Sequence, residues 1–127
     1  MKKDISLTSL ILRVSLGSMM LTHGYGKFMN LISGETGFAD PFGLGQLPSL
    51  IFAVFAEFFC SIFLIVGFKS RLAAIPPAIV MLVAIFMIHW EDPWRRQEFP
   101  LLYLVGFIAI YLLGSGKYSL DWKLKKV

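Results

Sequence analysis

Residues 48–68 read PSLIFAVFAEFFCSIFLIVGF, an apolar run in which Glu57 is the only charged residue. A helix of this length, rising about 1.5 Å per residue, crosses the roughly 30 Å of hydrocarbon in a bilayer. The composition agrees, since 57% of the 127 residues are hydrophobic and the mean hydropathy is +0.72. These values exceed what is usual for a soluble domain. The run therefore predicts a membrane-spanning helix.

Three further segments have a similar character. They span residues 5–28, 72–90 and 98–115. We expect one domain over residues 1–127, an all-α integral membrane protein built as an antiparallel bundle of four transmembrane helices. Loops at 31–47 and 91–97 would join the helices on one side.

The first segment could be mistaken for a cleaved signal peptide, because Lys2 and Lys3 precede an apolar stretch. Arg13 interrupts that stretch, however, and no small-residue cleavage pattern follows it. We therefore expect a retained helix.

The distribution of basic residues predicts the orientation. Four crossings place both termini on one side, together with eight basic residues: Lys2, Lys3, Lys69, Arg71, Lys117, Lys123, Lys125 and Lys126. The other side receives only Lys27, Arg95 and Arg96. The positive-inside rule then predicts cytoplasmic N- and C-termini and external loops at 31–47 and 91–97.

Prolines and a serine mark the expected helix boundaries. Pro48 and Pro100 suit the first turns of the second and fourth helices, and Ser70 suits the N-cap of the third. Pro76-Pro77 lies two turns inside the third helix, so we expect a kink there.

Several functions are disfavoured. The net charge of +4 is spread over chain ends and loops, which does not suit a nucleic-acid surface. Cys60 is the only cysteine, so neither an internal disulfide nor a CxxC couple can form, and we expect it to be a small buried hydrophobe. The chain also lacks GxGxxG, P-loop and GxSxG motifs. The sequence thus contains no motif that would carry electrons.

Arg13 and Glu57 are charged groups at membrane depth. On a helical wheel, Arg13, Gly17, Gly24, Lys27 and His23 fall on one face of the first helix. Arg13 and Glu57 lie at similar depth, which predicts a buried ion pair, hydrogen bond or proton relay between the first two helices. The alternative for Arg13 is to extend its side chain to the headgroups.

A second set of polar residues lies near the outer interface and contains His23, Lys27, His89 and Glu98. Each taken alone could be an ordinary interfacial group. Together they are the candidate catalytic or binding residues, because imidazoles and carboxylates exchange protons and an ammonium can bind an oxygen that gains charge. Those are the groups a quinone head requires. A metal or haem site is disfavoured, because the histidines lack a ligand spacing such as HExxH.

The chain resembles the DoxX family of small bacterial four-helix membrane proteins. The resemblance rests on 12–17 (LRVSLG), 22–24 (THG), Lys27, Glu57, 67–74 (GFKSRLAA), His89, Glu98 and 114–121 (GSGKYSLD). It implies a place in the bacterial inner membrane and a link to quinone oxidoreductases, to oxidative-stress systems and to separate redox subunits. Arg13, His23, Lys27, Glu57, His89 and Glu98 match the family's polar positions.

Three functions remain open from the sequence. The first is a membrane component of an oxidoreductase system, with a quinone as its cofactor or ligand near the outer leaflet and a redox-protein subunit as its partner. The second is a structural or assembly partner of a membrane complex, and the third is a small solute or proton transporter. The expected surroundings are the lipid bilayer and further copies of the chain in a homo-oligomer.

Overall fold

The computed structural model describes residues 3–38, 40–88 and 90–124. The elements are α1 (Lys3–Ser33), α2 (Gln46–Val54), the π-helical η1 (Phe55–Phe59), α3 (Cys60–Val66), α4 (Ser70–Val83), the π-helical η2 (Ala84–Ile88), α5 (Trp94–Leu113) and α6 (Leu120–Lys123). Four helical stretches are long and apolar enough to cross a membrane: residues 4–33, 46–66, 70–88 and 94–113. The predicted four-helix fold is confirmed.

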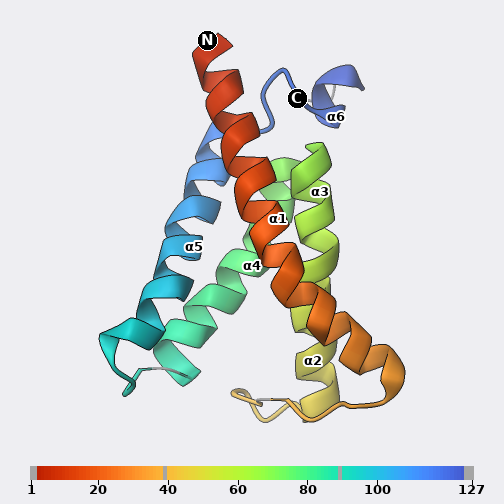
Figure 1. Cartoon of the computed structure of the whole chain (residues 1–127), viewed down its shortest axis with the longest axis vertical. Coiled ribbons are helices and arrows are strands. Elements are labelled where there is room, and N and C mark those ends of the chain that lie inside the picture. Colours follow the sequence, from red (N-terminus) through yellow and green to blue (C-terminus); the bar gives the residue numbers. More distant parts are fainter. Residues whose placement is uncertain (1–2, 39, 89, 125–127) are drawn as a thin grey trace.

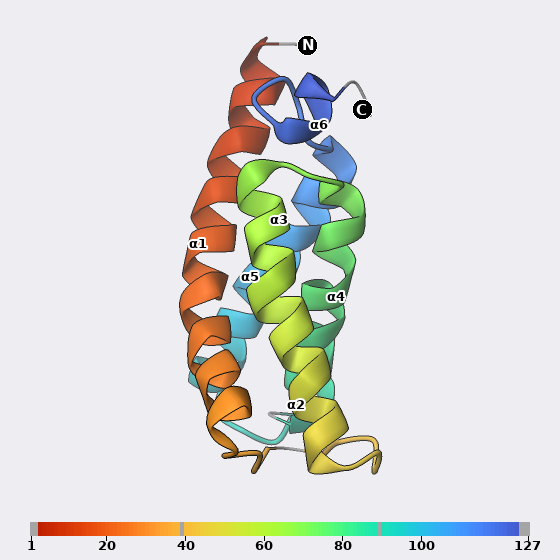
Figure 2. The same cartoon turned by 90° about the vertical axis from the view of Figure 1, so that its right-hand side faces the viewer.

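The helices form an antiparallel bundle with two distinct ends (Figures 1 and 2). The start of α1 lies beside α6 at one end, here called the termini end. The connections that follow α1 and η2 lie at the other, here called the loop end. Which end faces the cytoplasm stays a prediction.

The fourth helix begins earlier than the sequence predicted. Pro93 is its N-cap residue and α5 starts at Trp94, so residues 94–97 of the expected 91–97 loop are helical. Pro100 lies inside the helix instead of at its start. Proline has no N–H group to donate to the carbonyl of Arg96, but Arg96 is exposed and lies in the first turn of the helix, so the helix tolerates the proline there.

The N-terminus of α4 also differs from expectation. Lys69, with a left-handed φ of 48°, is the N-cap residue, and Ser70 is the first helical residue. The capping group comes from far along the chain. The carboxylate of Asp121 accepts hydrogen bonds from the backbone N–H groups of Lys69 at 2.9 Å and Ser70 at 3.4 Å. This contact fixes α6 over the termini end.

The two prolines of the third crossing lie inside α4, which continues through them to Val83. Pro77 is buried in the bundle. The expected kink at this point stays a prediction.

Glycines on α1 allow the first two crossings to pack closely. A Cβ atom added to Gly24 would lie 2.5 Å from the carbonyl oxygen of Glu57, and one added to Gly17 would lie 3.0 Å from that of Ser61. Only glycine permits this approach. The glycine-bearing face of α1 therefore packs against the second crossing, as predicted.

The middle of the bundle is tightly packed. Met20, Cys60, Leu64, Phe107 and Ile110 are at most 2% exposed. Cys60 is a buried hydrophobe, as its sequence setting predicted.

Candidate functional site

Arg13 does not contact Glu57. Its buried guanidinium donates hydrogen bonds to the carbonyl oxygens of Leu64 at 3.1 Å and Tyr118 at 2.7 Å, and to the hydroxyl of Ser9 at 3.3 Å. The predicted Arg13–Glu57 contact is therefore wrong. Arg13 lies level with Leu64, seven residues beyond Glu57, which is about 10 Å along a helix. Arg13 instead ties α1 to the end of α3 and to the segment before α6.

Glu57 pairs with Lys27. The Lys27 Nζ and Glu57 Oε1 atoms are 2.5 Å apart, and the two side chains are 29% and 2% exposed. The pair joins α1 to η1. Lys27 lies about one turn beyond Gly24, and Gly24 is the residue at which the α1 backbone packs closely against the backbone of Glu57. The structure thus combines one residue from each of the two polar sets identified in the sequence.

The backbone around Glu57 is unusual. Residues 55–59 form the π-helical turn η1, and residues 84–88 of the third crossing form a second, η2. A π turn inserts an extra residue and so changes the direction of the side chains it carries. Such turns occur often at functional sites. Here η1 carries Glu57 into the bundle, and Ala84 and Ile88 of η2 line the same cavity as Glu57.

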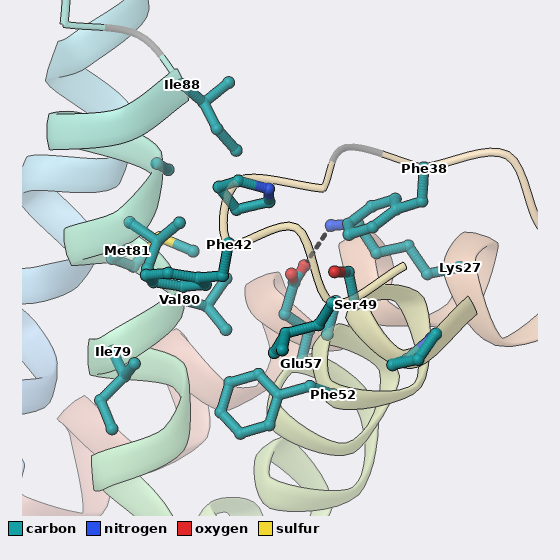
Figure 3. Close-up of a pocket in the computed structure, with 16 residues that line it drawn as sticks. Lys27, Phe38, Phe42, Ser49, Phe52, Glu57, Ile79, Val80, Met81 and Ile88 are labelled. Atoms are coloured by element: carbon teal, nitrogen blue, oxygen red, sulfur yellow. Dashed lines mark hydrogen bonds and ion pairs between the residues drawn. The ribbon is translucent and has the colours of Figure 1, made fainter. Parts of the chain in front are cut away.

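A cavity of about 510 Å³ lies at the loop end, between the second and third crossings. Its lining comprises Lys27, Phe38, Pro41, Phe42, Leu44, Pro48, Ser49, Phe52, Ala53, Glu57, Ile79, Val80, Met81, Val83, Ala84 and Ile88. Figure 3 shows Phe42 of the loop between the two helices, with the Lys27–Glu57 pair drawn as a dashed line to its right, next to Phe38. Apart from this ion pair and the Ser49 hydroxyl, the described residues that line the larger cavity are apolar.

A smaller cavity of about 170 Å³ adjoins the same ion pair. It is lined by Met20, His23, Lys27, Glu57, Met81, Ala84, Phe99, Pro100 and Tyr103. Lys27, Glu57, Met81 and Ala84 line both cavities. These four residues therefore form the wall between them.

The remaining candidate residues differ in whether they line a cavity. His23 is exposed, lines the smaller cavity and meets the ring of Tyr103 edge-to-face, with ring centroids 6.0 Å apart. Glu98 is exposed on α5 and lines neither cavity. His89 lies outside the described residues. The structure thus brings His23, Lys27 and Glu57 together and leaves Glu98 apart.

Within residues 3–38, 40–88 and 90–124, no three His, Cys, Asp or Glu side chains lie close enough to hold a metal ion. The candidate site is instead an ion pair between an apolar cavity and a partly polar one. It can hydrogen-bond an oxygen through the ammonium and accept a proton on the carboxylate.

The sequence did not predict several residues of the site. Phe38, Phe42 and Leu44 come from the 31–47 loop, and Tyr103 comes from the middle of an apolar helix. The only feature that could have indicated the loop residues is that a glycine-rich segment between two crossings carries two phenylalanines. Tyr103 has no such indication, because a tyrosine in an apolar helix is unremarkable and Tyr111 lies in the same helix.

Comparison with known proteins agrees with this fold. The family model DoxX matches residues 8–90. The chain belongs to the DoxX family. A Bacillus subtilis protein named "Putative oxidoreductase CatD" is 30% identical over 124 residues, covering 95% of this chain and 90% of that protein. An uncharacterized Haemophilus influenzae protein is 30% identical over 130 residues, covering 93% and 83%. No solved structure matches.

The DoxX match contains the site's main features. Every residue that lines the larger cavity, including Lys27 and Glu57, falls within residues 8–90. The smaller cavity adds three residues from α5, beyond the match. With its family and its four apolar helices, the chain is a membrane protein.

Proposed function

We propose that this DoxX-family chain is the membrane component of an oxidoreductase system and that it binds a quinone-like head group in the larger cavity. The observation that carries the proposal is the Lys27–Glu57 pair at the wall of an otherwise apolar cavity of about 510 Å³. The relative named as an oxidoreductase supports the same reading.

The cavity fits such a ligand in size and chemistry. Small-molecule sites commonly measure roughly 300–1,000 Å³ and combine an apolar lining with a few placed polar groups. Phe38, Phe42 and Phe52 offer aromatic surface to a ring. Lys27 can hydrogen-bond a ring oxygen that becomes negative, and Glu57 can accept a proton from a ring hydroxyl.

A quinone would supply the two-electron chemistry, because the chain has no electron-carrying motif of its own. This chain would bind and orient the ring, exclude water from it and exchange its protons. A separate redox subunit would exchange the electrons. That division of labour explains how so small a membrane domain takes part in redox chemistry.

The position of the cavity suits a lipid-soluble ligand. Phe52 and Ile79 line it from neighbouring crossings, and both are 43% exposed, so the cavity is not sealed off from the surroundings of the bundle. A ligand dissolved in the bilayer can therefore enter from the side. If the termini are cytoplasmic, as the basic residues predict, the cavity lies in the outer leaflet of the bacterial inner membrane.

The two alternatives receive less support. A transporter needs a path through the bundle, and the layer formed by Cys60, Leu64, Phe107 and Ile110 separates the cavities from the termini end. A purely structural role accounts well for Arg13, but it does not explain an apolar cavity beside a charged pair.

The test is the quinone content of purified protein, measured by mass spectrometry per mole of chain. Removing one partner would leave a buried charge unpaired and could unfold the bundle. The informative variant is therefore the double change Lys27→Met with Glu57→Gln, and the matched control is Lys123→Met with Glu91→Gln, both exposed. Loss of a charge-assisted hydrogen bond should lower retention about tenfold or more.

The control should retain as much quinone as the wild type. Equal retention in the double variant, or no quinone in the wild type, would contradict the proposal. An unchanged melting temperature in the double variant would show that its fold is intact.

A further inference from the structure

We propose that the smaller cavity is a proton path, in which His23 relays protons between Glu57 and water. The inference deepens the proposed function and rests on it for the origin of the protons. It assigns separate roles to the two cavities: the larger one would hold the ligand, and the smaller one would serve its carboxylate.

The shared wall carries the first step. Glu57 lines both cavities, so its carboxylate can take up a proton from the larger cavity and release it into the smaller one. Among the described residues that line the larger cavity, the other polar side chains are Lys27 and Ser49. Lys27 is a donor when charged, and a serine hydroxyl does not take up a proton near neutral pH. Glu57 is therefore the acceptor for a proton released there.

The contents of the smaller cavity carry the second step. His23 and Tyr103 lie on it, and His23 is exposed. An imidazole is the side chain suited to accepting and releasing protons near neutral pH. The volume of about 170 Å³ leaves room for a short chain of water molecules between Glu57 and His23. The ring contact with Tyr103 holds the imidazole at this position.

The elements packed around Glu57 bring few other proton carriers to the two cavities. Lys27 and His23 come from α1 and Tyr103 from α5, while α4 and η2 contribute no titratable side chain to either cavity. One competing route exists. Ser49 donates a hydrogen bond to Asp40 at 3.3 Å, which connects the larger cavity to an exposed carboxylate. Asp40 also accepts from the backbone of Gly45, so it has a role in shaping the loop.

The proton balance is simple. In the forward direction the O–H bond of a ring hydroxyl breaks and one forms on the Glu57 carboxylate. That bond breaks in turn as an imidazole nitrogen of His23 gains the proton, and His23 then releases it to water. Because Glu57 and His23 are then free of that proton, the same steps carry the proton of the second hydroxyl, so two protons reach water while the two electrons of the quinol leave separately to the redox subunit.

The test follows Glu57 alone and needs no ligand. Purified protein in lipid nanodiscs is jumped from acid to neutral pH, and stopped-flow infrared spectroscopy follows the loss of the protonated carboxyl band that Glu57→Gln removes. We expect His23→Phe, which keeps the aromatic contact, to slow this loss about tenfold or more. Added imidazole should restore the rate, which a merely structural defect would not allow.

Two further variants decide between routes. Tyr25→Phe changes an exposed aromatic residue on α1 that lines neither cavity, and should match the wild type. Asp40→Asn tests the competing route. A wild-type rate in His23→Phe, or slowing in Asp40→Asn alone, would overturn the proposal.

Quinone retention in the same samples separates this inference from the proposed function. If Glu57 loses its proton more slowly in His23→Phe and the wild type holds no quinone, the proton path is supported and quinone binding is rejected. If the wild type binds quinone and His23→Phe loses the carboxyl band as fast as the wild type, the proton path is rejected and the proposed function is kept.

Discussion

Lys27 and Glu57 form an ion pair whose members are unequally exposed: the carboxylate is 2% exposed and the lysine side chain 29%. The asymmetry follows from position, since Glu57 points inward from η1 while Lys27 reaches it from α1 near the loop end. Loss of the lysine would therefore leave a buried charge without a partner, whereas loss of the glutamate would leave a partly exposed one. Its consequences for stability can be tested directly.

Lys27→Met should destabilise the bundle more than Glu57→Gln. The first change leaves a buried carboxylate without its partner, and breaking a buried pair costs about 3–5 kcal/mol. The second leaves an ammonium that can turn toward water. Thermal unfolding in one detergent should show the larger loss of Tm for Lys27→Met. Equal losses would contradict the assigned burial.

Gly24→Ala should destabilise the protein, whereas Gly26→Ala should not. A Cβ atom at Gly24 would meet the backbone of Glu57 at 2.5 Å, and one at Gly26 would meet nothing within 4 Å. Alanine at an open helical position is favourable by about 0.5–1 kcal/mol. A fall in Tm for the first variant and no fall for the second would confirm the close packing. Similar behaviour of the two would argue against it.

Arg13→Met should loosen the termini end while leaving the cavities intact. The guanidinium holds the carbonyls of Leu64 and Tyr118, so its loss frees the segment that leads into α6. Hydrogen exchange should become faster in residues 114–124, and quinone retention should stay near the wild-type level. Loss of retention with unchanged exchange would instead give Arg13 a role in ligand binding.

Asp121→Ala should destabilise the start of α4. The carboxylate accepts hydrogen bonds from the backbone of Lys69 and Ser70, and loss of such a cap costs about 1 kcal/mol. Faster amide exchange at Lys69 and Ser70 would confirm the cap. A matched change, Asp4→Ala, removes an exposed acidic residue in the first turn of α1 and should leave those two amides unaffected.

The four-helix fold was predictable because each crossing is a long and predominantly apolar run, and the glycine-bearing face of α1 was predictable from helical periodicity. The partner of Glu57 was not. Helix lengths in the sequence place Arg13 level with Glu57, whereas Arg13 lies level with Leu64, and Lys27, about four turns further along α1, is the residue that reaches Glu57. The two π-helical turns and the loop residues of the larger cavity depend on tertiary packing, which local sequence patterns do not encode.

The ends of the helices were also predicted less well than the helices themselves. Ser70 has the features of an N-cap, yet the capping carboxylate comes from Asp121, some fifty residues away. Pro100 has the features of a helix start, yet α5 begins at Trp94. Local patterns identify which segments are helical more reliably than where they begin.

The most direct test of the central claim is photolabelling of the chain in membranes with an azido-quinone, followed by peptide mapping. The account predicts adducts on residues that line the larger cavity, in residues 38–57 and 79–88, suppressed by excess unlabelled quinone and lost in the Lys27→Met, Glu57→Gln double variant. Labelling spread over the lipid-facing surface, or unchanged in the double variant, would contradict the account.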